Sequence, residues 1–179
     1  MAVIYTEENG QYTLDCTLAM WSTDQVHTYY QDSSHTYGNL SLLCDVDFVI
    51  ENESHILLVE YKNASIPGAA NPGAFKPTEE KKLQNVARKF YDSTHWLYLA
   101  GKDKPKKYIY ILEYPAGNST SRLMLRNKLA ERLPFALQNS IATAGRKLID
   151  EVKVVSISEW NADSELKIYP LLPVNASTT

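Results

Sequence analysis

The chain lacks several features whose presence would assign it to a class. Its 179 residues include two cysteines, too few for a disulfide framework. No apolar run approaches the roughly 20 residues that a bilayer-spanning helix needs. The N-terminus has no basic start and carries Glu7 and Glu8 where a secretory signal is apolar. We therefore expect a cytoplasmic protein without membrane contact, in which Cys16 and Cys44 are free thiols.

Basic residues are missing from the first third of the chain. Residues 1–60 contain ten acidic side chains and no Lys or Arg, whereas residues 61–132 contain fourteen basic and six acidic ones. The formal net charge of the whole chain is −3. A net acidic chain is unfavourable for general nucleic-acid binding, but the basic middle third keeps that function open.

Several common catalytic signatures are also missing. The chain has no Gly-x-Ser-x-Gly elbow and no Gly-rich phosphate-binding loop. Its four histidines do not have the spacing of metal ligands. Carboxylates and lysines are therefore the candidates for any catalytic chemistry.

Apolar periodicity predicts a single α/β domain over residues 1–179, with a mixed central sheet flanked by helices. Asn9-Gly10 favours the positive φ angles of a tight turn, which predicts a hairpin in an N-terminal extension over 1–39. This extension also has a short helix near 24–31, and residues 40–160 form the core. The expected core elements are strands at 40–50 and 55–62, a helix at about 79–91, strands at 95–101 and 107–114, a helix over 120–139 and a strand at 151–157.

Charged residues interrupt the first two core strands, which are apolar at nearly every other position. The segment CDVDFVIENESHILLVEYK, residues 44–62, has Asp45 and Asp47 in its first run and Glu60 and Lys62 at the end of its second. Side chains two positions apart in a strand share a face. A turn centred near 52–53 then puts Asp45 or Asp47 opposite or diagonal to Glu60. The sequence thus predicts two or three carboxylates and one ammonium on one face.

This set of side chains suits phosphodiester hydrolysis. Two close carboxylates repel each other unless a cation lies between them. Mg²⁺ and Mn²⁺ take oxygen ligands, lower the pKa of a bound water and stabilise charge on a phosphate. A nearby lysine can hold the attacking water or neutralise the transition state.

The spacing of Asp47 and, thirteen positions later, Glu60-Tyr61-Lys62 resembles the core motif of the PD-(D/E)xK nuclease superfamily. The hairpin DFVIENESHILLVEYK is similar to that of archaeal Holliday-junction resolvases and restriction endonucleases. The order of elements over roughly 40–115 is similar to the restriction-endonuclease-like αβββαβ core. The resemblance implies that Asp47, Glu60 and the Tyr61 carbonyl bind Mg²⁺ or Mn²⁺, and that Lys62 is the catalytic lysine. It implies a nucleic-acid substrate, DNA rather than RNA, and it is compatible with a homodimer.

Three parts of the family pattern have no single match in this chain. Some relatives use a polar residue from the helix after the Glu-x-Lys strand, for which Lys81, Lys82, Gln84 and Arg88 are the candidates here. Val46 stands before Asp47 where the motif has proline. Many relatives carry a further acid on a helix before the sheet, for which the candidates here are Glu7, Glu8 and Asp24. Asp45 is either a second metal ligand or a solvated acid at the start of the strand.

The nucleic-acid surface and the activity itself also remain open. Lys76, Lys81, Lys82 and Arg88, together with the basic run at 102–107, are expected to contact backbone phosphates. The loop at 65–78 is expected near the scissile strand. The alternatives are a catalytically inactive nuclease-fold protein that binds nucleic acid or another protein, and an α/β protein of unrelated activity in which the motif is accidental.

Overall fold

The fold was examined in a computed structural model that describes residues 1–34, 42–66, 73, 75–141, 143 and 145–174. The N-terminal elements are β1 (Ile4–Thr6), β2 (Tyr12–Asp15), β3 (Trp21–Thr23) and α1 (Val26–Tyr30). The central elements are β4 (Phe48–Glu51), β5 (Ile56–Asn63), α3 (Glu80–Leu99) and β6 (Lys106–Glu113). The C-terminal elements are α4 (Ser119–Ala130), α5 (Phe135–Ser140), β7 (Ile149–Val155), α6 (Ile157–Ala162), η2 (Leu166–Ile168) and β8 (Leu171–Pro173).

The described strands form two sheets. A five-stranded mixed sheet has the order β3-β4-β5-β6-β7, in which β3, β4 and β5 are antiparallel neighbours and β5, β6 and β7 run parallel. A three-stranded antiparallel sheet has the order β1-β2-β8. The chain is therefore a mixed α/β protein, as the sequence predicts.

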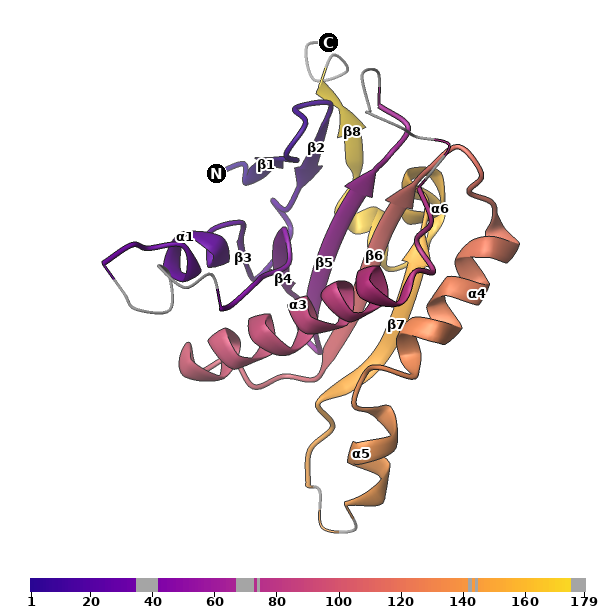
Figure 1. The fold of residues 1–179 in the computed structure, drawn as a ribbon. Coiled ribbons are helices and arrows are strands. Elements are labelled where there is room, and N and C mark those ends of the chain that lie inside the picture. Colours follow the sequence, from indigo (N-terminus) through magenta and orange to yellow (C-terminus); the bar gives the residue numbers. More distant parts are fainter. Residues whose placement is uncertain (35–41, 67–72, 74, 142, 144, 175–179) are drawn as a thin grey trace.

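The central strands are apolar at nearly every position because both faces of the five-stranded sheet are covered. Ile56 and Leu58 of β5 pack on one face against Leu83, Ala87 and Phe90 of α3 and against α4. Leu57 and Val59 pack on the other face, in a layer built from α6, η2 and the small sheet. Figure 1 shows α3 and α4 crossing one face of the sheet, with α6 on the other side. Glu60 and Lys62 share the face of Leu58, so they belong to the α3 side.

Several predicted elements differ from the observed ones. The strand predicted at 95–101 is wrong, because α3 continues to Leu99 with Leu97 buried in the core. The helix predicted over 120–139 is two helices, α4 and α5, because Pro134 stands at the break between them. The predicted N-terminal hairpin is confirmed, with Gly10 at a φ of 68° in the turn between β1 and β2.

Two further expectations concern membranes and cysteines. Among the described helices, none has both the length and the apolar character that crossing a membrane requires. Cys16 and Cys44 are free thiols, as predicted. Burial raises the pKa of both thiols to about 12, so neither is poised as a nucleophile.

Candidate active site at the end of the β4–β5 hairpin

The strand register brings Asp47 and Glu60 together. Phe48 of β4 pairs with Val59 of β5, so Asp47, the residue before Phe48, lies opposite Glu60. Asp45 and Asp47 are in the extended segment that leads into β4, rather than inside the strand as expected. Both nevertheless line the same pocket as Lys89 of α3, while Val46 between them packs in the α3-side core.

Asp47 is tied to β5 through the backbone. Its Oδ2 accepts a hydrogen bond of 2.6 Å from the backbone N–H of Tyr61. This carboxylate oxygen takes the position where a carbonyl of a longer β4 would continue the ladder. Burial raises the pKa of Asp47, while the charge of Lys89 and the bond from Tyr61 act against that rise.

Glu60 is buried, with 7% of its surface exposed, and its partner comes from α3. Lys89 Nζ lies 2.8 Å from both carboxylate oxygens of Glu60. Burial raises the pKa of Glu60 well above its usual range, and repulsion from Asp47 raises it further. Burial acts to lower the pKa of Lys89, but attraction to Glu60 and Asp47 outweighs it and raises that pKa. Lys89 is therefore a charged ammonium held among acids.

Sequence reasoning missed Lys89, because it looks like one of several basic residues on the outer side of an amphipathic helix. The structure puts it at the edge of the buried stripe, three residues after the partly buried Val86 and four before the buried Ser93. Residues at these spacings share one side of a helix. That spacing is the signal that could have identified Lys89 in advance.

Asp45 lines a pocket of about 440 Å³ beside this ion pair. Asp47, Lys89 and the exposed His27 line the same pocket. Burial raises the pKa of Asp45 to about 6, with Asp47 adding to the rise and Lys89 and His27 opposing it. Asp45 therefore lines the pocket and is not a fully solvated acid.

The three N-terminal acids also line this pocket, but their carboxylates are engaged differently. Glu7 is buried and accepts backbone N–H bonds from Asn9 and Gln11, each 2.7 Å, so it stabilises the β1–β2 turn. Glu8 lies 3.2 Å from the ammonium of Lys62, and Asp24 accepts from the side-chain amide of Gln25 at 2.7 Å. Glu8 and Asp24 thus contact side chains, whereas Glu7 bonds to the backbone.

Lys62 lies at the rim of the site. Its side chain is 45% exposed, and its Nζ contacts Glu8 rather than Asp47 or Glu60. Its charge is close enough to oppose the raised pKa of Asp47. The predicted acids and lysine thus gather at one end of the hairpin, with Lys89 rather than Lys62 bound to Glu60.

The basic residues expected to contact nucleic acid lie before and along α3. Lys76 and Lys81 are exposed. Lys82 pairs with Glu79 at 3.2 Å and stands over the Phe75 ring, and Arg88 pairs with Asp92 at 3.2 Å. Residues 67–72 and 74 of the expected loop at 65–78 lie outside the described residues.

The basic run at 102–107 is at the wrong end of the sheet to share a ligand with Asp47 and Glu60. Lys106 pairs with Ile56, four residues before Glu60 along β5. Lys102 and Lys104 form ion pairs with Glu51, at the far end of β4. The run therefore lies at the other end of the sheet from the Asp47–Glu60 cluster, and its expected contacts with backbone phosphates stay a prediction.

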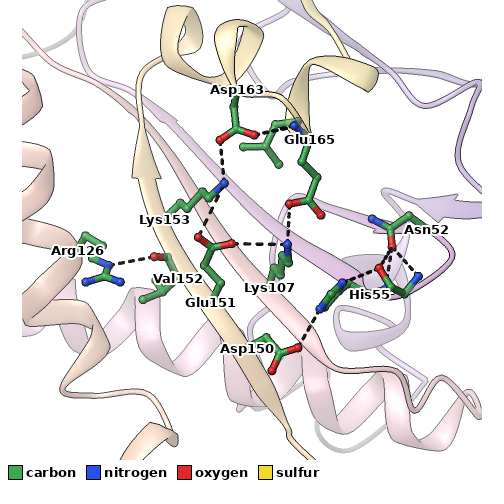
Figure 2. Close-up of polar contacts among 12 residues, drawn as sticks. Asn52, His55, Lys107, Arg126, Asp150, Glu151, Val152, Lys153, Asp163 and Glu165 are labelled. Carbon is green, nitrogen blue, oxygen red and sulfur yellow. Dashed lines mark hydrogen bonds and ion pairs between the residues drawn. The ribbon is translucent and has the colours of Figure 1, made fainter.

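A second charged cluster lies on the opposite face of the sheet, between β6, β7 and the segment after α6 (Figure 2). Lys107 Nζ is 2.6 Å from Glu165 and 3.6 Å from Glu151. Lys153 Nζ is 2.7 Å from Asp163 and 3.8 Å from Glu151. Each carboxylate of this cluster, named here the β6–β7 network, has a lysine in contact.

The chemistry open to the Asp47–Glu60 cluster depends on its excess of negative charge. One ammonium, Lys89, serves Asp45, Asp47 and Glu60, and all three have raised pKa values. Within the part of the chain that the structure describes, no three His, Cys, Asp or Glu side chains converge as a ready-made metal site. The chain matches no family model, no curated protein and no solved structure.

Proposed function

We propose that this chain is a metal-dependent nuclease built on a restriction-endonuclease-like core, with Asp47, Glu60 and Lys62 at its centre. The observation that carries the proposal is the register that sets Asp47 opposite Glu60 on the α3 side of the sheet. The parallel β5-α3-β6 crossover behind this hairpin agrees with the αβββαβ order.

The residues present fit a divalent cation on three grounds. The Asp47–Glu60 cluster has one ammonium for three acids, so it lacks positive charge. Among the described residues, Asp47 Oδ1 has no hydrogen-bond donor, whereas Oδ2 accepts from Tyr61. The N–H and C=O of one strand residue point to the same side, so the Tyr61 carbonyl faces Asp47. Asp47, Glu60 and this carbonyl would hold Mg²⁺ or Mn²⁺, with Asp45 as a further oxygen donor.

The resident groups have separate roles in this proposal. The metal supplies Lewis-acid stabilisation and a lowered pKa for a bound water. Lys89 holds Glu60 through both carboxylate oxygens, each of which keeps a further lone pair that would be open to a metal. Lys62, held at the rim by Glu8, orients the attacking water or neutralises the phosphate charge.

The substrate follows from the surroundings of the site. The exposed Lys76 and Lys81, with Lys82 and Arg88, would contact backbone phosphates without reading bases. We propose DNA rather than RNA as the substrate and the cytoplasm as the location, both on the resemblance and the composition. Acids around the pocket, including Glu8 and Asp24, disfavour phosphate binding until a cation neutralises them.

A second candidate function rests on the Lys89–Glu60 contact. The Lys89 ammonium lies 2.8 Å from both oxygens of Glu60, so it can take the place of a metal ion beside that carboxylate. If that pair never opens, the chain is a catalytically inactive nuclease-fold protein that binds nucleic acid or another protein.

The test is cleavage of plasmid, single-stranded DNA and RNA by wild type, Glu60→Ala and Lys62→Ala. Lys167→Ala, which removes an exposed lysine outside the site, is the matched control. The proposal expects cleavage that requires Mg²⁺ or Mn²⁺ and is lost in the first two variants but kept in the control. Salt-dependent DNA binding without cleavage would support the catalytically inactive protein. If the chain neither cleaves nor binds DNA, the motif is accidental.

A further inference from the structure

A second pocket lies between the C-terminal half of α3, the start of β6 and the segment 146–148. Its volume is about 480 Å³. It is lined by aromatic and aliphatic side chains, including Tyr91, Tyr98 and Leu148, and by Lys106 and Arg146. Lys106 pairs with Ile56 at the start of β5, four residues from Glu60, or about 13 Å along an extended strand. The pocket is therefore separate from the Asp47–Glu60 cluster.

Lys106 is the unusual residue in this pocket. It is 4% exposed, and its ammonium makes no hydrogen bond or ion pair with any residue that the structure describes. Its Nζ is not among the buried side-chain atoms that lack a partner in the described residues, so the ammonium keeps access to solvent and to a ligand in the pocket although the stem is buried. Burial lowers the pKa of Lys106, with Asp103 and Arg146 nearby acting in opposite directions. Its neighbour Lys107, on the opposite face, is in contrast paired with Glu165 and Glu151.

The other donors of the pocket point to the same kind of ligand. Thr94, on the α3 wall, has a buried hydroxyl oxygen without a hydrogen-bond partner among the described residues. Arg146 and Lys147, at the mouth, have side chains that are 76% and 71% exposed and share their charge with Asp103 and Asp150. The Thr94 oxygen is buried from solvent, so the Lys106 ammonium is the donor that a ligand in the pocket can reach. A phosphoryl group has three terminal oxygens and more negative charge than a carboxylate, which suits an ammonium with two further cations nearby.

We propose that this pocket binds a small phosphomonoester with an aromatic body, whose phosphoryl oxygens accept hydrogen bonds from Lys106 Nζ. Tyr98, 77% exposed beside the pocket, supplies a face for the aromatic body. Arg146 and Lys147 add charge at the mouth. The proposal does not depend on nuclease activity, because it uses no residue of the Asp47–Glu60 cluster.

The structural alternative is that Lys106 only packs its aliphatic stem in the core and sends its ammonium toward water. In that case Lys106→Met keeps the packing of the stem, removes a solvated charge and changes no phosphate binding. Phosphate binding thus separates the two explanations, whereas stability alone does not.

The test is calorimetric titration of the full chain with phenyl phosphate, inorganic phosphate and benzoate, in EDTA so that no divalent cation takes part. We expect phenyl phosphate to bind wild type more tightly than inorganic phosphate does, and benzoate to bind least. Lys106→Met should weaken the binding of phenyl phosphate at least about tenfold, which corresponds to the loss of one charge-assisted contact. Lys167→Met, which removes an exposed lysine elsewhere, should leave the affinity within about twofold.

Two variants of exposed side chains keep the test valid if Lys106→Met fails to fold. Tyr98→Ala should weaken the binding of phenyl phosphate but leave the binding of inorganic phosphate unchanged. Arg146→Met should weaken the binding of both ligands a few-fold. Undiminished binding by Lys106→Met, no binding by wild type at millimolar concentration, or a preference for benzoate would overturn the proposal. Binding of a 5′-phosphorylated oligonucleotide at least tenfold tighter than phenyl phosphate would also overturn it, because the occupant would then be a nucleic-acid end.

Discussion

The Asp47–Glu60 cluster and the β6–β7 network are built from the same residue types, but the pKa of Asp163 in the network shifts in the opposite direction to those of Asp45, Asp47 and Glu60. Asp163 in the network has a lowered pKa: burial would raise it, but Lys153 and two backbone N–H bonds outweigh burial. Asp45, Asp47 and Glu60 all have raised pKa values, because burial, with repulsion from neighbouring acids, outweighs the charge of Lys89 and of the other cations nearby. Burial is the largest cause of each raised pKa in the Asp47–Glu60 cluster, whereas the Asp163 side chain is 23% exposed, against 9% for that of Glu60. Burial and the supply of donors together make the difference.

This contrast separates a structural ion network from a candidate site. In the network, two lysines contact three carboxylates and lower the cost of burying them (Figure 2). In the Asp47–Glu60 cluster, Lys89 is the one lysine that bonds an acid, and the raised pKa values show that the ionised forms of the three acids are poorly compensated. Perturbed pKa values of this kind concentrate at functional sites. We interpret the deficit as room for a divalent cation.

The largest expected effect is on cleavage. Glu60→Gln keeps the shape of the side chain but removes its charge, so we expect the rate to fall by about 10²–10³-fold or more. Glu151→Gln, the matched change in the β6–β7 network, should leave the rate within about twofold because Glu151 lies on the other face. Initial rates on plasmid DNA with Mn²⁺ check both variants, and equal losses would remove the distinction between the clusters.

The next effect is on stability when the central lysine is removed. Lys89→Met leaves three acids without their ammonium, so we expect a loss of about 2–4 kcal/mol at pH 8. The loss should shrink at pH 5, where the acids take up protons. Lys107→Met in the network leaves Glu165 and Glu151 partly exposed to water and should cost only about 1–2 kcal/mol. Urea denaturation at the two pH values measures these differences, and a larger loss for Lys107→Met would contradict the account.

The smallest effect is the pH dependence of single acids. The pKa of Asp45 is about 6 in the folded protein, above its usual 3.8, so wild type loses stability as the pH rises between these values. We expect Asp45→Asn to be more stable than wild type by about 1–2 kcal/mol at pH 7.5, with no difference below pH 3.8.

Asp163→Asn provides the control with the opposite sign. The pKa of Asp163 is lowered, so its ionised form stabilises the fold above its usual pKa, and this stability is lost as the pH falls through the lowered value. The variant should therefore be less stable than wild type at pH 7.5 and approach it in strong acid. If Asp45→Asn and Asp163→Asn change the stability in the same direction at pH 7.5, the two environments do not differ as described.

The sequence predicted the parts of the fold that depend on local pattern. The apolar runs and the polar turn at 51–54 are sufficient to set the register of β4 and β5, and with it the meeting of Asp47 and Glu60. The Asn9-Gly10 turn followed in the same way from backbone preference, and Gly10 has the positive φ that such a turn needs.

The features that were missed depend on contacts between distant segments. The run HWLYL has the aromatic and aliphatic composition of a strand, yet it is helical, because Trp96 stacks on Trp21 and Leu97 enters the core. The strand β8 pairs with β2 although most of the sequence lies between them, and no local pattern indicates this pairing. Lys89 joins Glu60 through the packing of α3 on the sheet, so its role appears once the helix is in place.

The most direct test of the central claim is calorimetric binding of Mn²⁺ to wild type, Asp47→Asn and Glu60→Gln near pH 6, in two buffers of different ionisation enthalpy. We expect one Mn²⁺ per wild-type chain, with net release of protons, because the raised pKa values of these acids favour protonated forms that the metal displaces. Each variant should bind at least about tenfold more weakly. Wild type that binds no Mn²⁺ at millimolar concentration, or variants that bind it as tightly as wild type, would contradict the claim that the Asp47–Glu60 cluster holds a cation.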